Sequence, residues 1–203
     1  MNSQQYGHGY NNKNSATIVY VRYDKRIAKL ADRHEDTFAL QDPANFDALL
    51  MRFFEMYPAV FEKAIPGTLI QKVNGAPAVP AQALFTGDMV EMELMSTKEL
   101  RDLILQDLQT ALKGFRMKIR PEEIVKEVFE ATNDNPDEFI DKFTNKETKM
   151  VEDDLLYYED LLFKVFNSFP QKRLGGKSQM EVLHEELMDE FKKINTTQIH
   201  INK

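Results

Sequence analysis

Few residues of this chain have the types and the spacing that metal or nucleophile chemistry requires. The sequence contains no cysteine, which excludes disulfides, thiolate metal sites and cysteine nucleophiles. Glu181 and His184 have the spacing Glu-x-x-His, which supplies half of a di-iron carboxylate site. No second Glu-x-x-His occurs, and Met188 stands where a zincin would have its second histidine. We expect the other histidines to lie in tail or loop segments: His8, His34 and His200.

No nucleotide or nucleophile motif is complete either. Gly175-Gly176-Lys177-Ser178 ends like a P-loop, but Gln171 stands where the first glycine is required, and the preceding segment has the pattern of a helix. The nucleophile-elbow pattern Gly-x-Ser-x-Gly does not occur. We expect Gly175 and Gly176 to turn the chain and Ser178 to cap the next helix. The sequence therefore predicts no catalytic residue, no metal ion, no cofactor and no enzymatic activity.

Charged clusters leave a binding function open. The acidic runs Glu152-Asp153-Asp154 and Glu159-Asp160 could bind a cation or a basic partner, but we expect them to lie on solvated helix faces. No calcium-loop sequence accompanies them. A basic cluster around Phe115 could contact nucleic acid, and we favour a helix C-terminus there because cations are stabilised at that end. Its members are Lys113, Arg116, Lys118 and Arg120.

Composition restricts the partners further. The 203 residues carry a net charge of −7, which argues against phosphate-driven binding to nucleic acid or to anionic lipid. No apolar run approaches the roughly 18 residues that a membrane-spanning helix needs. Residues 1–15 are mostly polar and lack the apolar core of a signal peptide, so they are predicted to be a disordered tail. We expect a cytoplasmic protein whose partner is another protein.

The elements that would have to position a site change character along the chain. Thr17 to Tyr23 are rich in β-branched and aromatic residues, which predicts a strand, and a short second strand is predicted at 37–40 after a charged stretch. Asp42-Pro43 predicts the start of a helix over 43–57. The apolar residues of that helix fall on one face: Phe46, Leu49, Leu50, Phe53, Phe54 and Tyr57.

Three more strand signals follow this helix. A strand is predicted at 69–73, and Asn74-Gly75 after it is a strong turn signal because both residues tolerate positive φ. Ala78-Val79, flanked by prolines, is predicted to be a short edge strand. A last strand over 89–94 has Val90, Met92 and Leu94 on one face. A sheet in this order with one covering helix is the β-grasp arrangement.

Residues 16–95 also resemble the sulfur-carrier branch of that fold, the MoaD and ThiS proteins. The resemblance depends on Val73-Asn74-Gly75, on the spacing to Thr86-Gly87-Asp88 and on the closing strand from Val90 to Leu94. It implies a ubiquitin-like domain, and for true carriers a C-terminal Gly-Gly carboxylate that is activated and loaded with sulfur. Here the closing strand runs through Met95 into Ser96 and a helix, without a Gly-Gly.

From Ser96 onward the apolar residues recur at a helical period. Capping boxes are predicted at Ser96 with Glu99 and at Ser178 with Glu181, because each pair satisfies free amides at a helix start. Pro121 and Asn135-Pro136 predict two further helix starts. A fourth helix is predicted near 151–169, and Leu183, Leu187, Phe191 and Ile194 mark the last one.

The sequence thus predicts an α+β protein with two ordered parts. A β-grasp domain spans 16–95 and an α-helical bundle spans 96–196, between the tail at 1–15 and a C-terminal tail at 197–203. The favoured function is a non-enzymatic protein–protein interaction module, with the sheet or its edge as one contact surface. The alternative is a divergent sulfur-carrier-related protein of molybdopterin- or thiamine-type cofactor biosynthesis.

Overall fold

The computed structural model describes residues 16–144 and 150–201, with side chains as far as Lys193. The chain forms two compact units. The first contains residues up to Val60 together with Gln71–Glu93, and the second contains Phe61–Ile70 together with the residues from Leu94 onward. Residues 61–70, which the sequence analysis included in the first domain, therefore group with the helices. The predicted tail at 1–15 lies outside the described residues.

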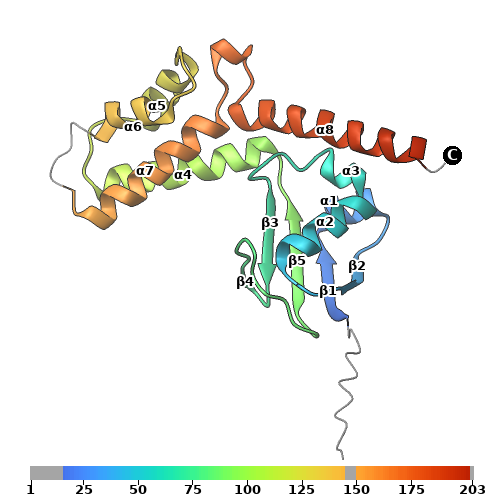
Figure 1. Ribbon diagram of the computed structural model, residues 1–203. Helices are drawn as coiled ribbons and strands as arrows, with labels where there is room; N and C mark the ends of the chain where they lie inside the picture. Colours follow the sequence, from blue (N-terminus) through green and yellow to red (C-terminus); the bar gives the residue numbers. More distant parts are fainter. Residues whose placement is uncertain (1–15, 145–149, 202–203) are drawn as a thin grey trace, which may run out of the picture. The chain divides into compact units, whose positions relative to one another are not determined.

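The first unit is a five-stranded mixed sheet with the strand order β2-β1-β5-β3-β4. β1 is antiparallel to β2 and parallel to β5, and α2 packs against one face of the sheet (Figure 1). This strand order confirms the predicted β-grasp fold. Along the chain the elements are β1 (Thr17–Tyr23), α1 (Lys25–Ala31), β2 (Glu35–Leu40), α2 (Phe46–Met56), α3 (Pro58–Phe61), β3 (Leu69–Val73), β4 (Ala76–Pro77) and β5 (Met89–Leu94).

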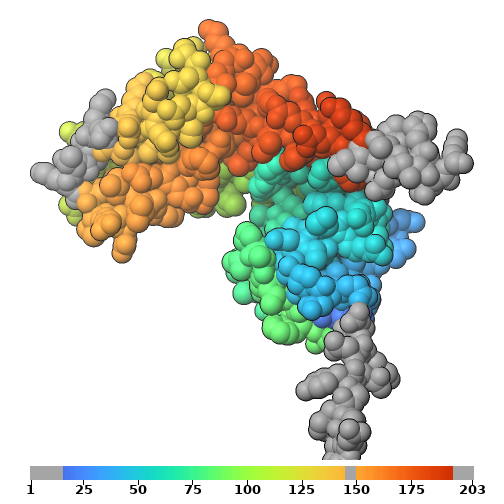
Figure 2. All heavy atoms as spheres, in the orientation of Figure 1, coloured from blue at the N-terminus to red at the C-terminus, as the bar shows by residue number. Residues whose placement is uncertain are grey.

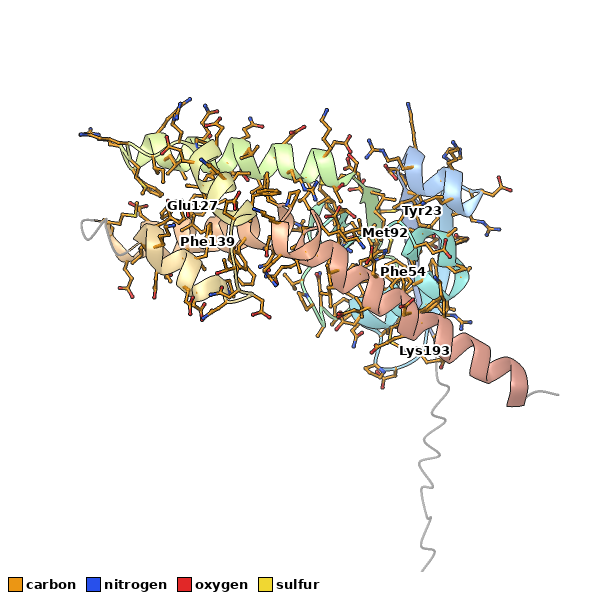
Figure 3. The ribbon with its side chains drawn as sticks, turned by 90° about the horizontal axis from the view of Figure 1, so that it is seen from above. Tyr23, Phe54, Met92, Glu127, Phe139 and Lys193 are labelled. Carbon is orange, nitrogen blue, oxygen red and sulfur yellow. The ribbon has the colours of Figure 1, made fainter. Side chains whose placement is uncertain are left out.

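Alternation along the strands divides their side chains between two faces of the sheet, and α2 covers one of these faces. Successive strand residues point to opposite faces, so the β-branched and aromatic residues of β1 at alternate positions reach the covered face together. Tyr23 lies there with its ring centroid 5.5 Å from that of Phe53, which α2 supplies. Figure 3 shows Tyr23, Met92 and Phe54 gathered in this unit. The buried apolar residues of β1, β5 and α2 include Val19, Val21, Tyr23, Val90, Met92, Phe46, Leu49 and Phe53.

Local details of this unit add one helix that was not predicted and correct two predictions. The charged stretch after β1 contains a helix, α1, which begins at the side-chain cap of Asp24 on the amide of Ile27. Asn45, not Asp42, caps α2, since its side chain accepts from the amide of Ala48 at 2.8 Å. The edge strand is Ala76–Pro77 instead of residues 78–79, because the tight turn before it brings it opposite the end of β3.

The second unit is a bundle of helices, as the helical period predicts. Its core joins apolar residues from four of the helices, and Figure 3 labels one of them, Phe139. The elements are α4 (Thr97–Gly114), α5 (Pro121–Phe129), α6 (Pro136–Thr144), α7 (Glu152–Ser168), the 3-10 turn η1 (Lys172–Leu174) and α8 (Gln179–Ile201). The core includes Ile104, Leu108, Leu112, Ile124, Val128, Phe139, Phe143, Tyr158, Leu162, Val165 and Phe166.

Both predicted capping boxes are present, and one of them also joins three helices. At the start of α8, the Ser178 amide donates to Glu181 Oε2 at 2.7 Å and the Glu181 amide donates to Ser178 Oγ at 3.2 Å. Arg101 of α4 donates to the same Glu181 oxygen at 2.9 Å and to the Ser168 carbonyl, which ends α7, at 2.8 Å. Burial opposes ionisation of Glu181, but the bonds from Ser178 and the charge of Arg101 hold the pKa of its carboxyl below the ordinary value.

The last helix differs from its prediction in length and in orientation. α8 continues to Ile201, so residues 197–201 are helical where a tail was predicted. Leu183 and Leu187, predicted as part of its apolar stripe, are exposed. His184 and Phe191 instead face the segment around Phe61, whose ring centroid lies 4.8 Å from that of Phe191. The apolar period predicted the helix correctly but could not show which side of it packs.

Candidate functional site

The uncovered face of the β-grasp sheet carries a row of side chains that the fold leaves exposed. The strand register places Tyr20 of β1 between Thr37 of β2 and Met89 of β5. Tyr20 is 46% exposed, whereas its chain neighbours Val19 and Val21 are buried on the other face. An aromatic ring in mid-strand therefore points to solvent because of the strand's alternation. We call this row, together with the charged row beside it, the tyrosine face.

The charged row lies one alternate position further along the same strands. Arg22 of β1 stands between Glu35 of β2 and Glu91 of β5. Opposite charges on adjacent strands stabilise a sheet modestly, by about 0.2–1 kcal/mol per pair. Charged side chains thus border the row that contains Tyr20. Tyrosine, methionine and arginine, which this face presents together, are residue types that protein interfaces favour.

A hollow of about 410 Å³ opens beside Tyr20. Glu35, Thr37 and Met89 line it, together with residues of β1 and β2. Its walls come from β-strands that hydrogen bonds hold in register, so the hollow is a preformed feature of the sheet. A partner's side chain could enter it and pack against the Tyr20 ring.

Asp36 fixes the strand next to this hollow. Its Oδ2 accepts hydrogen bonds from the hydroxyls of Tyr23, at 2.9 Å, and Tyr57, and its Oδ1 accepts from Arg33 Nη1 at 2.8 Å. The carboxylate therefore joins β1, β2 and the end of α2. Its side chain is only 9% exposed, so a charge held here needs these three donors.

The same contacts shift the titration of all three hydroxyl and carboxyl groups. Burial of Asp36 opposes its ionisation, but the hydrogen bonds from Tyr57, Arg33 and Tyr23 outweigh it and hold the pKa of the carboxyl below its ordinary value. Burial and then the bond to Asp36 raise the pKa of Tyr57 to about 12. Burial and Asp36 also raise the pKa of Tyr23. At neutral pH the Asp36 carboxylate is therefore charged and both tyrosine hydroxyls are protonated, so all three hydrogen bonds are present.

Glu181 and His184, which have the spacing of a half di-iron site, contact different parts of the helical unit. Glu181 belongs to the capping box and the ion pair with Arg101. His184 is buried, and its Nε2 lies 3.2 Å from the Glu62 carbonyl oxygen. Among the side chains that the structure describes, those of residues 16–144 and 150–193, no group of three or more histidine, aspartate or glutamate residues is placed to hold a metal ion.

The diglycine lies in a closed loop between α7 and α8. Gln171 and Lys177 form a backbone bridge, and the Gly176 amide donates to the Gln171 carbonyl at 3.0 Å. The Gln171 side chain is fully buried and donates to the Phe166 carbonyl at 2.8 Å. The segment before the loop is helix α7, so the strand that a P-loop requires is absent there, as predicted.

Replacing Gly176 with alanine should lower the free energy of unfolding by about 1 kcal/mol. Gly176 has φ +85°, and no atom would meet an added Cβ, so the cost comes from the backbone alone. Gly114→Ala, at an uncrowded position within α4, should instead stabilise the protein by up to about 1 kcal/mol. Urea denaturation of the two variants measures both changes, and a stabilising Gly176→Ala would contradict the assigned conformation.

The charged clusters lie where the sequence predicted, in helix ends and on exposed faces. Glu152, Asp153 and Asp154 form the first turn of α7, where the helix dipole favours negative charge. Asp160 pairs with Lys164 at 2.5 Å. The basic cluster surrounds the end of α4, and its Arg120 pairs with Glu123 at 2.8 Å.

Sequence reasoning did not single out the tyrosine face. The alternation in Thr17–Tyr23 was visible, and it divides the strand into two faces. Both faces of that strand carry a tyrosine, Tyr20 on one and Tyr23 on the other, so residue type did not show which face is covered. The packing of Phe53 and Tyr57 against Tyr23 shows which face is covered, and the strand register places Thr37 and Met89, both remote in sequence, beside Tyr20 on the other face.

Comparison with known proteins gives no family model and no curated protein that matches this chain. Among solved structures, a Pyrococcus furiosus protein provisionally described as molybdopterin converting factor, subunit 1, is 21% identical, with a TM-score of 0.37. The match covers 39% of this chain and 98% of that one. The Haloferax volcanii small archaeal modifier protein 1 is 14% identical over 38% of this chain and 97% of its own, with a TM-score of 0.36.

A third similar structure is the Haloferax volcanii HVO 2177 protein, which is 14% identical, with a TM-score of 0.37. That match covers 45% of this chain and 95% of the other. The similarities concern the ubiquitin-like fold of the N-terminal part. The described residues contain no helix with the length and apolar character to cross a membrane.

Proposed function

We propose that this chain is a non-enzymatic protein–protein interaction module and that the tyrosine face of its ubiquitin-like sheet is the contact surface. The observation that carries the proposal is the row of exposed Thr37, exposed Tyr20 and half-buried Met89 beside a preformed hollow. Tyrosine is an enriched anchor at interfaces because its ring buries a large apolar area while its hydroxyl keeps a hydrogen bond.

The edges of the sheet are less suited to binding than its face. β4 at one edge has only two residues and contains Pro77, which cannot donate to an added strand. β2 at the other edge begins with Glu35 and Asp36, and charges at an edge oppose strand addition. A partner strand therefore gains little there, whereas the tyrosine face presents side chains in fixed positions.

A photo-crosslinking residue at position 20 tests this proposal in the native cells. We expect it to form a covalent adduct with one partner protein, identified by mass spectrometry. The matched control is the same residue at Met51, which is 68% exposed on α2. With the partner identified, Tyr20→Ala should weaken its affinity at least about tenfold, whereas Met51→Ala should not. Equal labelling at both positions, or none at position 20, would refute the proposal.

The alternative function, a sulfur-carrier-related protein, requires a free diglycine carboxylate. β5 ends at Leu94 and leads into the capping box of α4, so the sheet is not followed by such a terminus. Gly175-Gly176 is internal and lies in the bridged loop. Intact-mass analysis of protein from its native cells separates the two functions. A dominant species that ends at Gly176 and carries a thiocarboxylate would favour the carrier, and full-length chain alone would favour the interaction module.

A further inference from the structure

The helical unit contains a second surface that the proposed function does not use. A groove of about 530 Å³ lies between α7, η1 and α8. Its apolar wall includes Phe163, Leu174, Met180 and Leu183. In Figure 2 the orange atoms of α7 and the red atoms of α8 lie side by side in this unit.

The side chains of this wall are unusually exposed for their size. Phe163 and Leu183 are each 47% exposed, and Leu187, one helical turn beyond Leu183, is 38% exposed. α8 packs against its own unit through His184 and Phe191, which face the segment around Phe61. Its Leu183–Leu187 stripe is therefore not needed for that packing. Grouped exposed apolar side chains of this kind mark binding grooves.

One polar atom at the groove lacks the partner that burial demands. Gln179 contributes to the lining, and its Nε2 is buried without an acceptor in the part of the chain that the structure describes. An unpaired buried donor costs about 1–3 kcal/mol.

The charges around the groove favour a basic occupant. Asp134 and Glu186 line it against one cation, Arg173, whose Nε already donates to Gln171 Oε1 at 2.9 Å. From Leu183 to Phe191, α8 has four carboxylates and no lysine or arginine. A second copy of this chain bound through the same surface would bring these acids against each other, which like-charge repulsion disfavours.

We propose that this groove binds an amphipathic helix of a partner protein, with apolar side chains at i, i+4 and i+7 flanked by lysine or arginine. The apolar face of such a helix would pack against the apolar wall of the groove, and its basic flanks would lie near Asp134 and Glu186. The groove lies wholly within the helical unit, so this inference is independent of the tyrosine face.

Panning a phage-displayed library of random 16-residue peptides against the full chain tests the inference. We expect the enriched peptides to share the helical apolar period and a net positive charge. Leu183→Glu should weaken their binding at least about tenfold, because it removes an apolar anchor. The matched control is Leu156→Glu on α7, which adds the same charge at a position that is 59% exposed and outside the groove lining, and which should leave binding unchanged.

Several results would overturn the inference. Attraction by charge alone predicts that Leu183→Glu strengthens binding, because it adds an acid to the groove. Enrichment of acidic peptides, of peptides without the helical period, or of none would also contradict it. Sedimentation equilibrium provides a separate check, because a dimer that Leu183→Glu dissociates would assign the groove to a second copy. Phe163→Ser, at the opposite wall, should reproduce the loss of peptide binding if Leu183→Glu acts through the groove and not through misfolding.

Discussion

Replacing Phe53 with alanine should lower the free energy of unfolding of the β-grasp unit by about 3–5 kcal/mol. Phe53 is fully buried on α2, and its ring packs against Tyr23, Phe54 and Tyr57. Truncation removes this burial and leaves a cavity that the hydrogen-bonded sheet cannot close. Hydrogen exchange of the β1 amides, followed by mass spectrometry at increasing urea concentrations, measures the loss within this unit.

The control for this prediction lies on the same helix. Met51 is exposed, so Met51→Ala should change the free energy of unfolding by no more than about 0.5 kcal/mol. A Phe53→Ala loss of the same small size would show that α2 does not cover the sheet with this face. Far-ultraviolet circular dichroism of both variants checks that the helix content of the whole chain is unchanged.

Replacing Asp36 with alanine should destabilise the same unit by about 3 kcal/mol at pH 7. The change leaves the hydroxyls of Tyr23 and Tyr57, two buried residues, without their acceptor. Arg33→Ala is the matched control, because it removes only a donor that is 54% exposed, and should cost about 0–1 kcal/mol. Comparable losses in the two variants would contradict the role given to the tyrosine bonds.

The Asp36 cluster also predicts how stability depends on pH. The folded state holds the pKa of Asp36 below its ordinary value. The contribution of this carboxylate to the free energy of unfolding is therefore complete above about pH 4 and is lost on further acidification. The folded state raises the pKa of Tyr57 to about 12, so stability is lost as pH rises from about 10, the unfolded value, through 12. Urea midpoints across this range should show both losses in the natural protein and smaller ones in Asp36→Ala.

The starts of α4 and α8 and the turn after β3 were predictable because neighbouring residues determine them. Ser96 with Glu99 and Ser178 with Glu181 satisfy free amides within one turn of helix, whatever the rest of the chain does. Asn74 and Gly75 both have positive φ, so two adjacent residues determine the turn that follows β3. α1 was not predicted because its apolar set is short and lies among charged residues. The members of that set, which are buried in the folded unit, are Ile27, Ala28 and Ala31.

The sequence by itself determined the order of the strands and of the longer helices, the absence of thiol chemistry and the change from a sheet to a bundle near Ser96. The tertiary structure decided which faces those elements expose. Leu183 and Leu187 have the same apolar character as buried residues of α7, yet they are exposed because α8 packs through His184 and Phe191. Likewise, Tyr20 and Tyr23 are the same residue type on the same strand, yet Tyr20 is exposed on one face and Tyr23 is buried on the other. Local periodicity divides an element into faces, but which face is buried depends on contacts between residues remote in sequence.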